Sequence, residues 1–105
     1  ANNIQSYKTL QHQHLNEIHQ SLHGLQGNSN AYVNFVPWRG DFTRGIFVTS
    51  VLSIDATLES LQHLYKSFYA THSFTHVADA NIDLKQVVNT NKCLIHLEQQ
   101  EDVII

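Results

Sequence analysis

The chain has 105 residues, of which 42% are hydrophobic and 14% are charged. This balance excludes a disordered tail and a coiled coil, and the apolar runs are too short to span a membrane. We therefore expect one soluble, globular domain without a membrane partner. The formal net charge is -3 without any basic cluster, which argues against a nucleic-acid partner. The single cysteine forms no internal disulfide, and no leader precedes the first element, so we expect a cytoplasmic protein.

A helix is expected soon after the start of the chain. Ile18, Leu22 and Leu25 recur at the i, i+4, i+7 spacing that places apolar side chains on one stripe of a helix. Asn16 precedes this stripe as an N-cap, and Glu17 supplies an acid where the helix dipole favours negative charge. We therefore predict that the helix begins at Asn16.

Two histidines, His12 and His14, precede this helix. Imidazoles beside a carboxylate such as Glu17 are the groups that proton transfer near neutral pH requires. We expect both histidines in an extended segment outside the helix, with side chains on opposite faces. Only one of them is then expected to face any given pocket.

A turn and two strands are expected after the helix. Residues 27–30 form a Gly, Asn and Ser cluster typical of a turn, and residues 31–36 alternate apolar and other residues until Pro37 ends the pattern. Residues 38–44 have no apolar period and predict a loop. Residues 45–54 are rich in β-branched and aromatic residues, which predicts a strand central in its sheet.

The second half of the chain predicts a helix followed by short strands. Residues 57–70 carry apolar side chains at helical spacing, with Asp55 or Thr57 as the cap. The strands are expected at residues 74–77, 86–90, 93–98 and 103–105. This order predicts an α+β fold, with helices packed on one face of a mixed, largely antiparallel sheet.

The apolar sequence that ends the chain, Val103-Ile104-Ile105, has no polar residue after it. We expect it to leave an exposed strand edge, which complete proteins rarely tolerate. Residues 1–105 are therefore expected to be a single domain excised from a larger protein.

Several motifs occur in one order along nearly the whole chain. They are Tyr7 followed by His12-Gln13-His14-Leu15-Asn16-Glu17-Ile18, then Phe35-Val36-Pro37, then Thr43-Arg44-Gly45-Ile46 with Thr49, then Phe68-Tyr69 before Ser73-Phe74-Thr75-His76-Val77, and finally Asn91-Lys92-Cys93-Leu94-Ile95. The first resembles the His-Arg-His-x-Pro-Glu-Ile motif of the N-acetyl-gamma-glutamyl-phosphate reductases, a family of semialdehyde dehydrogenases. The others resemble its Phe-x-Pro, Arg-Gly-Ile and Asn-x-Cys-x-Ile segments.

The resemblance implies a two-domain, NADPH-dependent reductase of arginine biosynthesis, or of lysine biosynthesis if the substrate is aminoadipyl rather than glutamyl. This chain would be its second domain, similar to the C-terminal domain of glyceraldehyde-3-phosphate dehydrogenase. NADPH and the catalytic cysteine would then belong to a nucleotide-binding domain absent from these residues, and the isolated fragment would be inactive. The resemblance also implies a small acyl phosphate as substrate and a homo-oligomer formed through the sheet.

The resemblance assigns roles to five residues of this sequence. His12 or His14 would be the catalytic imidazole, with His12 slightly preferred by analogy. Glu17 would fix the tautomer of the ring, and Tyr7 would line the substrate. Arg44 would bind the anionic substrate through its planar guanidinium.

The sequence departs from the family pattern at three places. Gln13 stands where the family has arginine, Asn16 stands where it has proline, and the loop after Trp38 lacks the usual second proline. The missing arginine removes a cation beside the substrate. Arg39 and Lys8 are near in sequence and are candidates to replace it.

Alternatives from other classes remain open at this stage. His19 and His23 are spaced i, i+4 on a helix and suggest a zinc site, although Gln20 stands where zinc hydrolases carry glutamate. A dimerisation module without a catalytic role is a further alternative. Cys93 is expected to be a small apolar residue inside its strand rather than a nucleophile.

Overall fold

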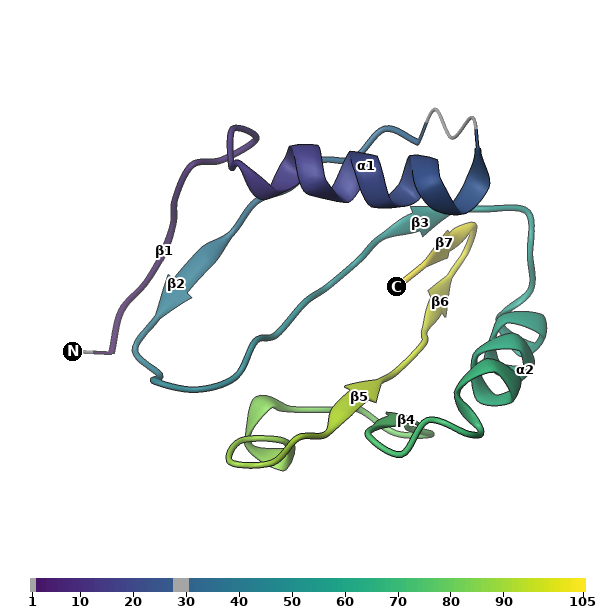
Figure 1. Ribbon diagram of the computed structural model, residues 1–105. Coiled ribbons are helices and arrows are strands. Elements are labelled where there is room, and N and C mark those ends of the chain that lie inside the picture. Colours follow the sequence, from purple (N-terminus) through teal and green to yellow (C-terminus); the bar gives the residue numbers. More distant parts are fainter. Residues whose placement is uncertain (1, 28–30) are drawn as a thin grey trace. The chain divides into compact units, whose positions relative to one another are not determined.

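The computed structural model describes residues 2–27 and 31–105, which form two compact units, Ala1–Phe42 and Thr43–Ile105 (Figure 1). The elements, in chain order, are β1 (Ile4–Ser6), α1 (His14–Gln26), β2 (Trp38–Gly40), β3 (Leu52–Ser53), α2 (Leu58–Tyr69), β4 (Thr75–Val77), η1 (Leu84–Gln86), β5 (Cys93–Ile95), β6 (Gln99–Gln100) and β7 (Val103–Ile104).

The first unit contains a short antiparallel pair of strands, β1 and β2, in which Gln5 is opposite Arg39. Two further backbone hydrogen bonds continue this pairing, from Tyr7 N to Pro37 O at 3.1 Å and from Leu10 N to Phe35 O at 3.0 Å. The predicted loop at 38–44 is therefore wrong, because it contains β2. The predicted strand at 31–36 is also wrong, since Pro37 has no N–H to donate and the pairing there is one-sided.

Helix α1 begins at His14, earlier than predicted. Its N-cap is Gln13 and not Asn16, while Glu17 lies in the first turn as expected. The half-buried apolar residues are Leu15, Ile18 and Leu22, whereas Leu25 is 82% exposed and does not belong to the buried stripe.

Helix α1 ends where the sequence predicted a turn to begin. Gly27 has a φ of 73° and donates its backbone N–H to His23 O at 2.8 Å, which satisfies one of the last carbonyls of the helix. The rest of the predicted turn, residues 28–30, lies outside the described residues.

The second unit contains α2, whose prediction is confirmed. Thr57 is its N-cap, and the Thr57 hydroxyl oxygen accepts a hydrogen bond from Ser60 N at 3.1 Å. Ser60 Oγ in turn donates to Thr57 O at 2.8 Å. The helix contacts β4, the strand that follows it in the chain.

Three antiparallel strands form a small sheet in the second unit, in the order β3-β7-β6. The expected exposed edge at 103–105 is wrong, since β7 is paired on both sides and Ile104 is only 1% exposed. The predicted central strand at 45–54 is reduced to Leu52–Ser53. High β-propensity does not form a strand where no neighbouring strand supplies hydrogen bonds.

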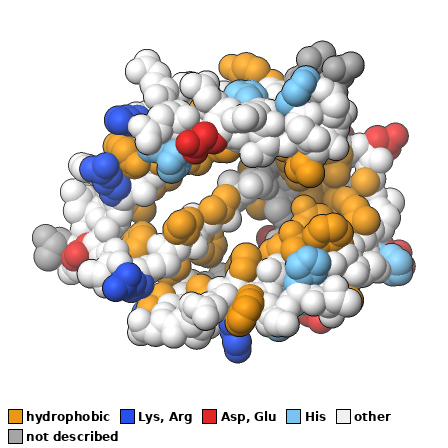
Figure 2. All heavy atoms as spheres, in the orientation of Figure 1, with side chains coloured by type: hydrophobic (Ala, Val, Ile, Leu, Met, Phe, Trp, Pro, Cys, Tyr) orange, Lys and Arg blue, Asp and Glu red, His pale blue; other side chains and the backbone are white. Residues whose placement is uncertain are grey.

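The segment before β3 exposes large apolar side chains. Ile46 is 83% exposed and Val48 is 72% exposed. Figure 2 shows hydrophobic atoms at the surface where Figure 1 draws the ribbon leading into β3. Among the described residues, the buried hydrophobic side chains are Leu97 and Ile104.

The parallel pair β4 and β5 completes the second unit. The chain between them forms the 3-10 helix η1, followed by turns at residues 87–89, so the predicted strand at 86–90 is wrong. Asp83 accepts a hydrogen bond from Lys85 N, and its own N–H donates to Gln86 Oε1 at 2.8 Å. This local capping box satisfies backbone groups that a strand would otherwise pair.

The two helices and the mixture of antiparallel and parallel pairs confirm the predicted α+β class. Among residues 2–27 and 31–105, no helix is both long and apolar enough to cross a membrane.

Candidate active site

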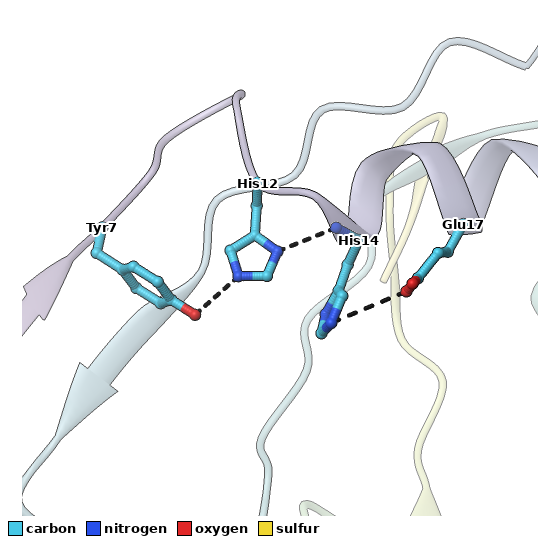
Figure 3. Close-up of polar contacts among 4 residues, drawn as sticks. All are labelled: Tyr7, His12, His14 and Glu17. Atoms are coloured by element: carbon cyan, nitrogen blue, oxygen red, sulfur yellow. Dashed lines mark hydrogen bonds and ion pairs between the residues drawn. The ribbon is translucent and has the colours of Figure 1, made fainter.

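The candidate site is built in the first unit, where the chain enters α1. His12 is 8% exposed, and both of its ring nitrogens have partners (Figure 3). Its Nε2 lies 2.8 Å from Tyr7 Oη, and its Nδ1 accepts a hydrogen bond from the backbone N–H of His14 at 3.2 Å. His12 therefore satisfies one of the backbone donors that a helix start leaves unpaired.

These contacts determine the tautomer of His12. The backbone N–H of His14 always donates, so Nδ1 of His12 must be the unprotonated nitrogen. In the neutral ring Nε2 carries the hydrogen and donates it to the hydroxyl oxygen of Tyr7. A proton on Nδ1 would place two donors against each other, so this geometry favours the neutral ring.

The electrostatic surroundings act in the same direction. Burial lowers the pKa of His12 below its usual 6.5, and the positive charges of His14, Lys8 and Arg39 lower it further, while Glu17 raises it. His12 is therefore a neutral hydrogen-bonding group near neutral pH.

His14 has a different environment, although it is close to His12. Their ring centroids are 4.5 Å apart, so the expectation of opposite faces is wrong. Residues two apart in an extended chain share a face, and His14 is already the first residue of α1. The His14 side chain is 54% exposed and its Nε2 lies 3.8 Å from Glu17 Oε2.

His14 and Glu17 line an open hollow of about 370 Å³ together with Ile18, Ser21, Leu22 and Phe35. Phe35 packs its ring against His12 at 5.5 Å between centroids. The hollow thus presents an imidazole and a carboxylate on an apolar floor. An accessible imidazole beside a carboxylate is suited to proton transfer with a bound small molecule.

Tyr7 and Arg39 form a stacked pair that the sequence did not indicate. The Arg39 guanidinium carbon lies 3.8 Å from the centroid of the Tyr7 ring, a cation–π distance. The backbone of Tyr7 bonds to Pro37, so Arg39 is its diagonal neighbour two residues along the opposite strand. A prediction of β1 and its register would have been needed to find the pair.

Arg44, the predicted anion-binding residue, belongs to the second unit, where it is exposed and precedes β3. The structure therefore groups four of the five predicted site residues in one unit, and the role of Arg44 stays a prediction. Cys93 is the first residue of β5 and is exposed, so the expectation that it lies inside its strand as a small apolar residue is wrong.

The zinc alternative finds no supporting observation. Within the part of the chain that the structure describes, no group of three or more His, Cys, Asp or Glu residues is arranged to hold a metal ion. His19 and His23 are both exposed on α1.

Comparisons with known proteins define the class. The model of the family described as "Semialdehyde dehydrogenase, dimerisation domain" matches residues 1–105. The chain belongs to this family, which confirms the resemblance seen in the ordered motifs.

Three curated relatives of the chain carry the same name. The chain is 55% identical over 104 residues to an N-acetyl-gamma-glutamyl-phosphate reductase of Phocaeicola vulgatus, covering 99% of this chain and 32% of that protein. It is 53% identical over 104 residues to the protein of the same name from Bacteroides fragilis, with the same coverage. For that of Karelsulcia muelleri the identity is 38% over 104 residues, again 99% of this chain and 32% of the relative. The chain thus spans about a third of the length of these relatives.

Proposed function

We propose that this chain is the substrate and dimerisation domain of an N-acetyl-gamma-glutamyl-phosphate reductase, and that it contributes the acid–base imidazole of the reaction. The observation that carries the proposal is the position of His14 and Glu17 on an open hollow, in a chain whose relatives bear that name. The rest of the protein would supply the reactive thiol.

The reaction requires proton transfer at two points. A cysteine thiol loses its proton and attacks the acyl phosphate, which releases phosphate and forms a thioester. Reduction of the thioester by the cofactor of the full-length protein would leave an oxyanion on that carbon, which takes up a proton to give the hemithioacetal. When the C–S bond then breaks, the hydroxyl proton passes to the leaving sulfur, and the semialdehyde and the free thiol form. One imidazole beside the carbon serves both steps, since it holds the proton between them.

His14 fits this role better than His12. Both nitrogens of His12 are already occupied by Tyr7 and by the backbone of His14, and its surroundings keep it neutral. The His14 ring is exposed, with Glu17 near one nitrogen. We therefore propose His14 as the proton carrier and His12 as the residue that holds the start of α1 and the Tyr7 hydroxyl in place.

The nucleotide site is proposed to lie outside this chain. A dinucleotide fold needs a glycine-rich turn before a helix, whereas α1 follows Gln13 and α2 follows Thr57. NADPH would supply the hydride from its own domain, while the residues of this chain would bind the substrate and move its proton. We also propose that the protein forms homo-oligomers through the sheet of this domain. Its proposed location is the cytoplasm.

The test uses the full-length protein. It is expected to oxidise NADPH with N-acetyl-gamma-glutamyl phosphate and to prefer this substrate to the aminoadipyl analogue by kcat/KM. Residues 1–105 alone are expected to show no turnover. Turnover by these residues, or a full-length protein that oxidises NADPH with neither acyl phosphate, would contradict the assignment. A preference for the aminoadipyl substrate would favour the alternative in lysine biosynthesis.

A further inference from the structure

Arg39 and Lys8 are the cations of the first unit beside the candidate site. Arg39 lies over the Tyr7 ring, and Lys8 follows Tyr7 in the chain. Figure 2 shows Lys and Arg atoms at the surface near the start of α1, beside imidazole and carboxylate atoms. Both side chains belong to exposed residues.

The hydrogen-bonding capacity of these cations is not used within the described residues. Neither Arg39 nor Lys8 takes part in an ion pair or a side-chain hydrogen bond there, whereas the ion pairs of the described chain join other residues. Asp41, the acid nearest to Arg39 in sequence, instead accepts a hydrogen bond from Asn2 N at 2.9 Å. The Arg39 guanidinium carbon lies over the Tyr7 ring, and no described residue accepts a hydrogen bond from the guanidinium, so its N–H groups are available to a ligand.

The local charge balance is suited to an anion. Lys8 and Arg39 both lower the pKa of His12, whereas the carboxylate of Glu17 raises it. A cation–π contact with Tyr7 favours one placement of the Arg39 side chain, which reduces the rotamer freedom lost when it binds a ligand. A held guanidinium with a free edge is the usual partner of a carboxylate or a phosphate.

We propose that Arg39, supported by Lys8, binds the anionic group of the substrate. The proposal rests on the proposed function for the identity of the substrate. The ligand chemistry is a tetrahedral or planar oxyanion next to the Tyr7–His12 pair. In an acyl phosphate it is either the phosphoryl group or the carboxylate at the other end of the molecule.

The first experiment separates these two sources. In the reverse direction the full-length enzyme uses NADP⁺, N-acetylglutamate semialdehyde and inorganic phosphate as separate substrates, so each KM is measured alone. Loss of a charge-assisted hydrogen-bonded contact in Arg39→Gln is expected to raise one KM by about tenfold to a hundredfold. Because Arg39 does not transfer protons, kcat is expected to stay within about twofold.

The affected substrate identifies the bound group. A higher KM for phosphate assigns Arg39 to the phosphoryl group, and a higher KM for the semialdehyde assigns it to the carboxylate. Arg39→Lys is expected to recover part of the loss, since it keeps the charge without the planar fork. Lys92→Gln, which removes an exposed cation of the second unit, is the matched control and is expected to change neither KM.

A second measurement does not depend on turnover. Calorimetric titration of full-length protein with inorganic phosphate and with N-acetylglutamate is expected to show binding of at least one anion, weakened at least about tenfold by Arg39→Gln. Unchanged KM values and unchanged anion binding in Arg39→Gln would overturn the proposal. An inactive wild-type protein that still binds an anion through Arg39 would instead refute only the proposed function.

Discussion

Replacing Gly45 with alanine is expected to destabilise the second unit by about 1.5 to 4.5 kcal/mol. Gly45 has a φ of 90°, where a residue with a side chain costs about 1 to 3 kcal/mol. A Cβ at this position lies 2.6 Å from Leu84 Cδ1 and 3.7 Å from Val88 Cγ2. Cδ1 is the end of a flexible side chain, so Leu84 can move aside for about 0.5 to 1.5 kcal/mol of rotamer strain.

Gly24 provides the matched control for this substitution. It lies inside α1, and a Cβ there meets no atom within 4 Å. Alanine is preferred to glycine in a helix by about 1 kcal/mol. Gly24→Ala is therefore expected to stabilise the protein, so that the same chemical change has opposite signs at the two positions.

The assay is equilibrium urea unfolding followed by far-ultraviolet circular dichroism. A double-mutant cycle with Leu84→Ala separates the two contributions, because the shorter side chain removes the close contact with Ala at position 45 and leaves the backbone strain. The cost of Gly45→Ala is expected to fall by about 1 kcal/mol in that background. Equal effects of Gly45→Ala and Gly24→Ala would refute the reasoning, as would a cost that does not depend on Leu84.

Two further predictions concern local structure. Thr57→Ala removes the acceptor for Ser60 N and is expected to lower the free energy of unfolding in urea by about 1 kcal/mol. Thr57→Ser keeps the hydroxyl and is expected to be close to wild type. An unchanged stability in Thr57→Ala would show that this cap adds none. Because the pKa of His12 in the folded chain is below its usual 6.5, the unfolded chain takes up this proton first as the pH falls. The contribution of the neutral His12 to the free energy of unfolding is thus complete above pH 6.5. It is lost as the pH falls from 6.5 toward the pKa of His12 in the folded chain. The difference in urea midpoint between wild type and His12→Asn is expected to shrink in that window, and a difference that grows there would contradict the sign.

The sequence predicted the elements whose signals are local. Helix α2 has its apolar period and the hydroxyl of Thr57 within one short segment, so its type and its start followed from the sequence. The parallel strands at Thr75–Val77 and Cys93–Ile95 were likewise found from β-branched and apolar residues between turn residues.

The elements that depend on distant partners were not predictable in the same way. Strand β1 has three residues and is defined only by its pairing with β2. The apolar segment 45–54 has high β-propensity, yet only Leu52 and Ser53 find a partner, in β7. Propensity describes a preference of the residue, whereas a strand also needs a neighbour with free backbone groups.

In the candidate site, too, local features could be predicted from the sequence, and contacts between distant residues could not. The motif from His12 to Glu17 identified the residues at the start of α1, but the extended lead-in assigned to His14 misplaced its ring. The stacking of Arg39 on Tyr7 needed the register of β1 and β2. The difference between a capped, buried His12 and an accessible His14 is likewise a property of three-dimensional contacts.

The central claim, that His14 carries the proton while His12 holds the site in place, is tested most directly by the rate of phosphate release when full-length protein is mixed with N-acetyl-gamma-glutamyl phosphate without NADPH. His14→Asn is expected to slow this acylation by about 10²- to 10⁴-fold. Glu17→Gln is expected to slow it by less than about fivefold, since the pair is exposed. His12→Asn retains an oxygen that can accept from the helix start and is expected to slow acylation by less than about tenfold. A loss in His12→Asn that equals or exceeds that in His14→Asn would contradict the account.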